Sequence, residues 1–387
     1  MRFTPLARRH EGIVVSVSDA HRFTVLLLFS SSELGGAERS LSRMALESQG
    51  MDYELATMNG EGPWCEWIRS HGRAPLVLGR RSFGGRLMLG AFWCLIRHVR
   101  SHPVDVICVC GARVALLLRV LRIFLPGIKL VHGVRWNPDS NSWLDRFFRL
   151  VERFTHPLVD SWITNSAIAK QTLVSRCRIP AERVFVIYNG LESLPADVPP
   201  LGERPLEVLT VANLNPRKGH REYLQVVREV LKVVPNAKFV FVGRDDMNGE
   251  VQQAIAEAGL SGHVSCEGFQ ADVSPWFRRA RVFVLPSLWN EGCPTAILEA
   301  MSFAVPCVAF AMDGIPELVE DGDHGILLQR GDYSGMTTAV IQMLTDDCKA
   351  EKLGKNGRGR VHSHFRLENT AALHLEAFNK ILLRYGV

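Results

Sequence analysis

The sequence lacks several features that would each point to a particular class of protein. No apolar run approaches the roughly 20 residues that a membrane-spanning helix needs. The best candidates, 87–96 and 300–312, are much shorter, and the second contains a proline. No GxGxxG turn follows an apolar stretch, which disfavours a NAD-dependent oxidoreductase. No recognisable nucleic-acid-binding module is present either, so we expect no nucleic-acid partner.

The nine cysteines are scattered, and none of their spacings is typical of a metal site. Cys108 and Cys110 are separated by a single residue, which does not fit a zinc motif. Several cysteines lie in apolar runs, where a reduced thiol behaves as a small hydrophobic side chain. The run 25–29 leads into a polar, glycine-rich loop, which indicates a core strand and not a signal peptide. We therefore expect a reducing, cytoplasmic environment.

What is present describes a globular chain with an uneven charge distribution. Its 387 residues are enough for two domains, and 47% are hydrophobic against 22% charged. Residues 1–190 hold 25 of the 45 lysines and arginines but only 15 of the 40 carboxylates, so the second half is acidic. A basic half predicts an anionic partner, for which an acidic membrane surface is one candidate.

Short apolar runs alternate with longer segments of helical periodicity throughout the chain. Near-continuous apolar strands separated by helices predict parallel sheets covered on both faces. The predicted strands of the first half are 25–29, 54–58, 75–78, 104–110, 129–134, 161–165 and 184–188. Those of the second half are 207–211, 238–242, 263–266, 282–285, 306–310 and 325–328. Two such series predict an α/β protein with two doubly wound domains.

A proline-rich stretch separates the two series. Residues 191–205 contain four prolines and little periodicity, as expected of a linker. The first domain is therefore predicted at 1–190 and the second at 206–365. The tail, 366–387, has a helical pattern with one apolar face, and it could pack back on the first domain.

Four polar or glycine-rich segments follow predicted strands, where doubly wound sheets bind ligands. They are 30–38 (SSSELGGAE), 211–219 (VANLNPRKG), 286–301 (PSLWNEGCPTAILEAM) and 311–318 (AMDGIPEL). Adjacent glycines let backbone amides approach an anion. Two cations, Arg217 and Lys218, could neutralise a diphosphate. Taken singly, the first two segments are as compatible with ordinary loops.

The third segment places two glutamates eight residues apart. Glu291 precedes a helix that Pro294 is expected to open, and Glu299 lies inside that helix. The amides that follow Glu291 could hold a phosphate while its carboxylate accepts sugar hydroxyls. Alternatively, Glu299 is an ordinary helix-surface carboxylate.

Together these motifs resemble the retaining glycosyltransferase family 4, whose members have the GT-B fold. The similarity extends from about residue 25 to 365. Its motifs, in chain order, are Gly-Gly-x-Glu at 35–38, Asn-Gly at 189–190, Lys218-Gly219, the E-x7-E pair Glu291 and Glu299, and the G-x-P-E loop at 314–319. The resemblance implies two Rossmann-like domains facing each other across a cleft, with the acceptor on the first domain and a nucleotide-sugar on the second.

The resemblance also implies roles for individual residues. Lys218, with Arg217, would hold the donor diphosphate, and Glu299 would hydrogen-bond the ribose. Glu291 would grip the transferred sugar, and His132 would lie near it, unless His132 is only a structural loop residue. Other residues implied in substrate binding are Gly35, Gly36, Gly292, Cys293, Pro294 and Thr295.

Two positions depart from the family pattern. Relatives often have an arginine after the glycine that ends the first strand of the second domain, whereas this chain has Ala212-Asn213. One phosphate-binding cation is therefore missing, and Arg217 could replace it. Cys293 stands where relatives often have an aromatic residue or leucine, and this thiol could alter sugar selectivity or have no effect.

We expect no metal and no other cofactor. The acidic residues at 245–246 and at 321 and 323 could suggest Mg²⁺, but both groups lie in polar turns. The resemblance implies same-face attack with retention of configuration, in which the leaving diphosphate helps to deprotonate the acceptor. No nucleophilic carboxylate can be named for a double displacement.

The acceptor side is less defined. Segments 80–100 and 113–129 mix arginine with large apolar residues. They could be core helices or could lie on an anionic membrane, and the excess positive charge favours peripheral contact with the inner face of the plasma membrane.

The sequence thus predicts a retaining, hexosyltransferase-like enzyme that moves a sugar from a UDP- or GDP-sugar to a glycan or lipid-linked acceptor, in cell-surface polysaccharide or glycolipid biosynthesis. Two alternatives are a non-catalytic nucleotide- or glycan-binding protein of the same fold and a GT-B sugar-nucleotide epimerase.

Overall fold

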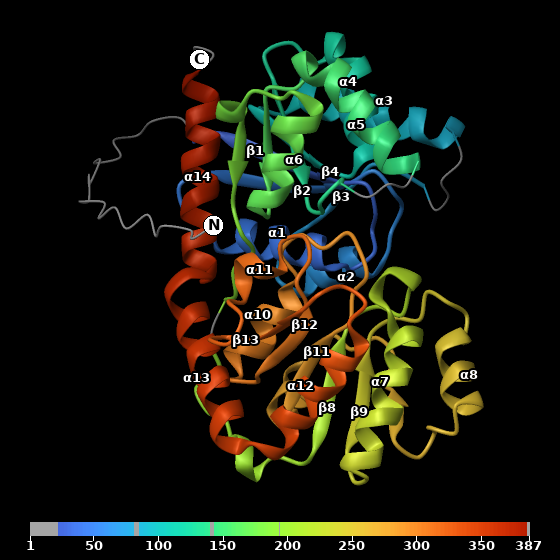
Figure 1. Ribbon diagram of the computed structural model, residues 1–387. Helices are drawn as coiled ribbons and strands as arrows, with labels where there is room; N and C mark the ends of the chain where they lie inside the picture. Colours follow the sequence, from blue (N-terminus) through green and yellow to red (C-terminus); the bar gives the residue numbers. More distant parts are fainter. Residues whose placement is uncertain (1–21, 81–84, 140–142, 193, 385–387) are drawn as a thin grey trace.

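The computed structural model describes residues 22–80, 85–139, 143–192 and 194–384. Two α/β domains lie end to end, and a pair of long helices runs along one side of both (Figure 1). Each domain is built on one parallel sheet whose faces are covered by helices.

The sheet of the first domain has seven strands in the order β3-β2-β1-β4-β5-β6-β7. They are β1 (Thr24–Phe29), β2 (Asp52–Thr57), β3 (Leu76–Val77), β4 (Val106–Cys110), β5 (Lys129–Val134), β6 (Ser161–Thr164) and β7 (Val184–Val186). Every residue of β1 and of β4 is buried, because helices cover both faces of these central strands.

The helices of this domain divide between the two faces of the sheet. They are α1 (Gly36–Glu47), α2 (Pro63–Ser70), α3 (Gly85–Ser101), α4 (Ala112–Val120), α5 (Trp143–Thr155) and α6 (Ala167–Cys177), with 3₁₀ turns η1 (Leu121–Phe124), η2 (His156–Leu158) and η3 (Ala181–Arg183). Side chains of α1 and α2 pack on one face, and side chains of α3, α4 and α6 pack on the other.

The second domain repeats this plan with six strands in the order β10-β9-β8-β11-β12-β13. They are β8 (Glu207–Val211), β9 (Lys238–Val242), β10 (Val264–Cys266), β11 (Val282–Leu285), β12 (Cys307–Phe310) and β13 (Gly325–Leu328). Its helices are α7 (His220–Val233), α8 (Glu250–Glu257), α9 (Ser274–Arg279), α10 (Thr295–Ser302), α11 (Ile315–Leu318), α12 (Tyr333–Thr345) and α13 (Asp347–His364), with turns η4 (Leu201–Glu203) and η5 (Pro216–Lys218).

All thirteen strands lie at the places that the apolar runs predict, with ends that differ by two residues at most. In both sheets the strand order reverses next to the first strand, between β1 and β4 and between β8 and β11. Such a reversal leaves a crevice at the carboxyl ends of the strands, where doubly wound proteins bind ligands.

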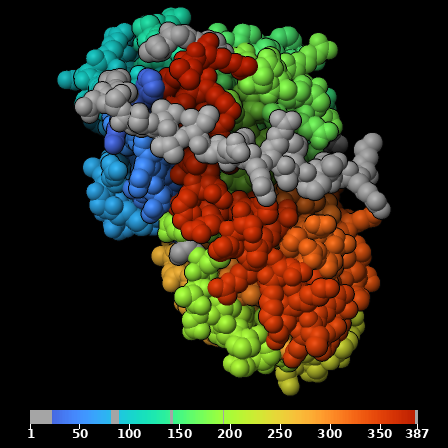
Figure 2. All heavy atoms as spheres, turned by 90° about the vertical axis from the view of Figure 1, so that its left-hand side faces the viewer, coloured from blue at the N-terminus to red at the C-terminus, as the bar shows by residue number. Residues whose placement is uncertain are grey.

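The chain crosses between the domains twice, and the two crossings are hydrogen-bonded to each other. The amide of Leu191 donates to the carbonyl of Phe365, and the amide of Leu367 donates to that of Leu191. After the second crossing, α14 (Leu367–Leu383) packs on the first domain. Figure 2 shows α13 and α14, in red, along one side of both domains.

The packing of α14 makes a stability prediction. Phe378 is fully buried in the core shared with α1 and α2, so Phe378→Ala should destabilise the first domain by about 3–5 kcal/mol. Leu373→Ala, on the exposed side of the same helix, should change stability little. Denaturant titration followed by circular dichroism measures both. Equal effects from the two substitutions would show that α14 is not part of this core.

Candidate functional site between the two domains

A cavity of about 300 Å³ lies where the carboxyl ends of the two sheets face each other. The first domain contributes the loop after β1 and the start of α1, and the second contributes the loops after β8 and β11 and the start of α10. Both strand-order reversals therefore open into one space. Ten of the eleven residues predicted for the site line it, namely Gly35, Gly36, Arg217, Lys218, Glu291, Gly292, Cys293, Pro294, Thr295 and Glu299.

A buried ion pair joins two of these residues. The ammonium of Lys218 donates a hydrogen bond to Oε1 of Glu291, and both side chains are almost inaccessible to solvent. Burial alone would raise the pKa of Glu291, but the nearby charges of Lys218 and Arg217 outweigh it and lower the pKa. Sequence spacing predicts both residues at the site but not their contact, because they lie 73 positions apart.

The loop after β8 is shaped to hold the two cations at the cavity. It forms η5 and ends at Gly219, whose φ of 70° lies in the left-handed region. A Cβ there would lie 2.3 Å from the carbonyl oxygen of Pro286, so glycine is required both for the turn and for the close approach to the loop after β11. Arg217 fastens the same two loops, since its Nη1 donates to the carbonyl of Asn290 at 3.0 Å.

The second glutamate lies on α10 and faces arginines of the first domain. Burial raises the pKa of Glu299, and the charges of Arg43 and Arg39 oppose this shift by favouring the carboxylate. Both arginines belong to α1 and line the cavity. Glu299 is therefore a cavity carboxylate, and the alternative of an ordinary surface residue is excluded.

The Gly-Gly-x-Glu loop approaches the second domain through its glycines. A Cβ on Gly36 would lie 3.9 Å from Oγ1 of Thr295, and one on Gly35 would lie 2.7 Å from the carboxylate of Glu38. Burial raises the pKa of Glu38, while hydrogen bonds from the amides of Glu38 and Gly35 oppose that shift. Glu38 thus turns back over the start of α1, which explains why a glutamate and glycine occur together here.

The Asn-Gly pair at the end of the first domain connects the two halves of the cavity. Nδ2 of Asn189 donates to the carbonyl of Cys293 at 2.6 Å, and its Oδ1 accepts from Ser40 at 2.9 Å. Gly292 lies so close to the first domain that a Cβ would meet Oδ1 of Asn165 at 2.3 Å. Burial raises the pKa of the Cys293 thiol to about 12, so it stays protonated.

Arg135 is a cavity residue that the sequence interpretation missed. It follows β5, lines the cavity, and donates through Nη2 to Oδ1 of Asn189. Its Nε and Nη1 are buried without a hydrogen-bond partner, which is costly for a guanidinium group. The available signal was an arginine three residues after His132, in the loop that follows a predicted strand.

His132 does not line the cavity, contrary to the expectation that it lies near the donor sugar. It belongs to β5, which continues to Val134, and its side chain is buried on the sheet face opposite α1. Its Nδ1 lies 3.1 Å from Oε1 of Glu152 and 3.0 Å from Nη2 of Arg119. Burial lowers the pKa of His132, which fits a structural residue in the core.

The fourth predicted segment lies at the domain interface and not in the cavity lining. Glu317 accepts hydrogen bonds from the amides of Ala167 (2.7 Å) and Ile168 (2.9 Å) at the start of α6, and from the hydroxyl of Tyr188 (2.8 Å). A carboxylate is favourable at a helix N-terminus. Asp313 accepts from Asn137 at 2.8 Å. This loop therefore fastens the second domain to the first.

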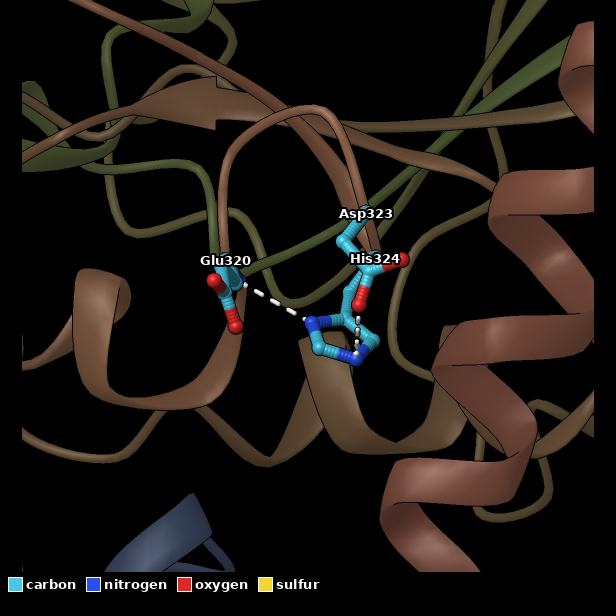
Figure 3. Close-up of side chains that lie close together, drawn as sticks. All are labelled: Glu320, Asp323 and His324. Atoms are coloured by element: carbon cyan, nitrogen blue, oxygen red, sulfur yellow. Dashed lines mark hydrogen bonds and ion pairs between the residues drawn. The ribbon is translucent and has the colours of Figure 1, made fainter. Parts of the chain in front are cut away.

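One group of three side chains in the described part of the chain has the spacing of metal ligands: Glu320, Asp323 and His324. Figure 3 shows that the histidine is already occupied, since Nδ1 accepts from the Glu320 amide at 3.3 Å and Nε2 contacts Asp323 at 3.1 Å. The group also lies outside the cavity lining. The other acidic turn is occupied as well, because Asp245 accepts from the amides of Met247 and Gly249.

The buried ion pair makes a pH-dependent prediction. Lys218→Met should cost about 3–5 kcal/mol near pH 7, because Glu291 is left charged and buried. Without the lysine, burial should raise the pKa of Glu291 above its unfolded value of about 4.3. In wild type, the charged Glu291 stabilises the folded protein above that pH. In the variant, protonation of Glu291 as the pH falls restores part of the lost stability. The difference in Tm between the two proteins should therefore shrink as the pH falls toward about 5.

Lys355→Met is the matched control, because Lys355 pairs with Glu351 on an exposed helix face and should matter little at any pH. Thermal melts of the three proteins across the pH range give the answer. If the Tm of Lys218→Met lies below that of wild type by the same amount at every pH, the charged form of Glu291 does not depend on this lysine.

The family models match both halves of the chain. The model described as Glycosyltransferase Family 4 matches residues 34–193, and the model described as Glycosyl transferases group 1 matches residues 205–346. Their boundary falls in the proline-rich crossing between the domains.

Similar proteins with assigned functions are glycosyltransferases. The chain is 27% identical over 195 residues to the amylovoran biosynthesis glycosyltransferase AmsK of Erwinia amylovora, an alignment that covers 48% of each protein. It is 32% identical over 177 residues to a GDP-mannose-dependent α-(1-6)-phosphatidylinositol monomannoside mannosyltransferase of Mycolicibacterium smegmatis, covering 44% of the chain and 45% of the relative. The matched part thus spans about half the length of these relatives.

Solved structures show the same fold over nearly the whole chain. HepE of Anabaena, in complex with UDP and glucose, superposes with a TM-score of 0.78 at 21% identity, covering 93% of this chain and all of that one. Sucrose-phosphate synthase of Thermosynechococcus elongatus superposes with a TM-score of 0.76 at 19% identity, covering 93% and 99%. With one family model on each domain and the GT-B arrangement over both, the chain belongs to the group 1 glycosyltransferases of glycosyltransferase family 4.

Proposed function

We propose that this protein is a retaining glycosyltransferase that moves a sugar from a UDP- or GDP-sugar to a glycan or lipid-linked acceptor, in the synthesis of cell-surface polysaccharide or glycolipid. The observation that carries the proposal is the single cavity between the two sheets, in which Lys218, Glu291 and Glu299 lie together with the N-terminus of α10. Cations, helix amides and carboxylates are the groups that a nucleotide-diphosphate sugar needs.

The donor is proposed to lie along the second domain. Arg217, Lys218 and the amides at the start of α10 bind its diphosphate, and Glu299 accepts a ribose hydroxyl. Phe269 lines the cavity and is partly exposed, so it offers an aromatic surface on which a base can stack. Glu291, fixed by Lys218, orients the transferred sugar together with the backbone after it.

Arg135 is proposed to supply the positive charge that is missing at Asn213, where relatives often have an arginine. It reaches the cavity from the first domain and has two buried donors without partners. An anionic group of the donor would satisfy them, so substrate binding would remove an existing desolvation cost. The missing arginine of the second domain is then compensated across the cavity and not within the same loop.

The proposed reaction proceeds on one face of the sugar. Among the cavity-lining residues, only Glu291 and Glu299 are carboxylates; the first is paired with Lys218 and the second is assigned to the ribose. Neither is free to form a covalent sugar intermediate. The leaving diphosphate oxygen therefore takes the proton of the acceptor hydroxyl as the new bond forms, and Arg217, Lys218 and the helix N-terminus stabilise its charge without a metal.

The acceptor and the cellular location are proposed from the relatives and from the cysteines. One relative, the UDP-Gal:α-D-GlcNAc-diphosphoundecaprenol α-1,3-galactosyltransferase of Escherichia coli, is named for a lipid-linked acceptor and is 24% identical over 255 residues. An equivalent acceptor here would meet the cavity from the first domain. All nine cysteines are free, which supports a reducing, cytoplasmic environment.

The alternatives remain a non-catalytic binding protein and a sugar-nucleotide epimerase of the same fold. A binding protein would take up the nucleotide-sugar but never release nucleoside diphosphate in the presence of acceptor. An epimerase would convert the sugar-nucleotide without any acceptor. The E-x7-E pair Glu291 and Glu299, together with Lys218 at the same cavity, favours transfer over both alternatives.

The donor site is tested by thermal stabilisation with UDP, GDP, ADP and their sugars. A nucleotide at about 100 times its Kd should stabilise the protein by about 2.7 kcal/mol and raise Tm by several degrees. Glu299→Gln should weaken binding of that nucleotide about 10- to 100-fold, because a charged acceptor of a hydroxyl is lost. Glu257→Gln, an exposed carboxylate on α8, is the matched control. No stabilisation by any nucleotide would contradict the proposal.

Metal independence is tested separately. Once a donor and acceptor are identified, transfer should proceed at an unchanged rate after EDTA treatment, because protein cations neutralise the leaving group. Release of nucleoside diphosphate is the measurement. Activity that is lost with EDTA and restored by Mg²⁺ would show that the proposed charge balance is incomplete.

A further inference from the structure

An exposed apolar stripe runs along one face of α5. Trp143, Phe147, Leu150 and Phe154 follow each other at intervals of four, three and four residues, which places them on one side of the helix. All four are exposed, Trp143 by 73% and Phe154 by 71%. Helices of soluble domains normally turn such a stripe toward the core.

Further exposed apolar residues lie on α3 and η1 of the first domain. Trp93 of α3 is exposed by 63% and Ile123 of η1 by 80%, and the ring of Trp93 lies 6.4 Å from that of Phe124. The guanidinium of Arg122 in η1 donates to the carbonyl of Leu158 directly after α5. Figure 1 shows α3, α4 and α5 gathered at the end of the first domain remote from the second. We call Trp93, Ile123, Trp143, Phe147, Leu150 and Phe154 the apolar face.

The fully exposed charges on the segments that form this face have one sign. On α5 the two acidic residues, Asp145 and Glu152, are buried, whereas Arg146 and Arg153 are exposed. Over the described residues between 89 and 158, none of the four carboxylates is exposed, while Arg97, Arg100 and Arg113 are. An apolar surface with only positive exposed charge is complementary to an anionic, amphipathic surface.

The two arginine-rich segments of the sequence divide between core and surface. Phe92 and Leu95 of α3 are buried against the sheet, while Leu89 and Trp93 point outward.

In the described part of the chain no helix is long and apolar enough to cross a membrane. Contact with a bilayer would therefore be made by this face lying on the surface.

We propose that the apolar face, centred on α5 and flanked by arginines, docks the first domain on an anionic lipid bilayer. The aromatic side chains enter the interfacial region, where Trp is favoured, and the arginines contact lipid headgroups. This inference rests on the proposed function, since a lipid-linked acceptor would be presented at such a surface. It names α5, which the sequence interpretation did not, as the principal contact.

Sedimentation with large vesicles tests the proposal. The full chain should bind vesicles of phosphatidylcholine with phosphatidylglycerol, bind vesicles of phosphatidylcholine alone far less, and be released by high salt. The variant Trp143→Ser, Phe147→Ser, Phe154→Ser should lose binding. Arg146→Gln with Arg153→Gln should weaken it about 30-fold, on about 1 kcal/mol for each arginine. Val233→Ser with Leu373→Ser, two exposed apolar residues elsewhere, is the matched control.

Nucleotide-induced thermal stabilisation of the same variants separates this inference from the proposed function. Vesicle binding lost in the triple variant, with its nucleotide response intact, supports the docking surface. If wild type binds a nucleotide but not anionic vesicles, the docking surface alone is overturned. The same holds if wild type binds no vesicles and instead self-associates through α5. A protein that binds vesicles but no nucleotide would overturn the proposed function instead.

Discussion

The functional site depends on how closely the carboxyl ends of the two sheets are held together. Each domain opens a crevice at the reversal of its strand order, but neither crevice alone has the full set of cavity groups. Contacts across the interface bring them together: Glu317 caps α6, Asn189 binds the carbonyl of Cys293, and Gly292 packs on the loop that carries Asn165. Each of these contacts is polar or glycine-mediated, and such interfaces permit domain movement more readily than apolar ones.

We propose that the charges within the cavity leave no carboxylate for covalent chemistry. The carboxylate of Glu291 fixes Lys218, and the arginines of α1 face Glu299. The remaining buried donors on Arg135 are unsatisfied. A site in which one carboxylate is paired, the other faces arginines and cationic donors are spare suits an anionic leaving group better than it suits a nucleophile. This balance links the packing of the two domains to the proposed same-face transfer.

Much of the fold could be predicted because its signals are local. Runs of four to seven mostly apolar residues predict every strand, since buried parallel strands need apolar residues on both faces. The cavity residues within 291–299 could also be predicted from the sequence, because they follow one another along the chain and lie together around the start of α10. The face on which a strand residue lies is harder to predict: the predicted strand 129–134 already contains His132, but only the packing of helices on the sheet shows that its side chain is buried on the face opposite α1. The position of Arg135 and the Lys218–Glu291 contact depend on tertiary packing, which the spacing of residues along the chain does not reveal.

On α5, burial of both acidic residues turns a mixed-charge helix into a positively charged apolar surface, which composition alone does not reveal.

One nucleotide-sugar is proposed to bind across both domains, and a crystal structure of the protein with the stabilising donor bound would show whether it does. We expect the diphosphate at Arg217, Lys218 and the start of α10, a ribose hydroxyl on Glu299, and Arg135 of the first domain within hydrogen-bonding distance of the ligand. A donor bound outside the cavity, or held by the second domain with Arg135 and the Gly35–Gly36 loop apart from it, would show that the two domains do not form one donor site.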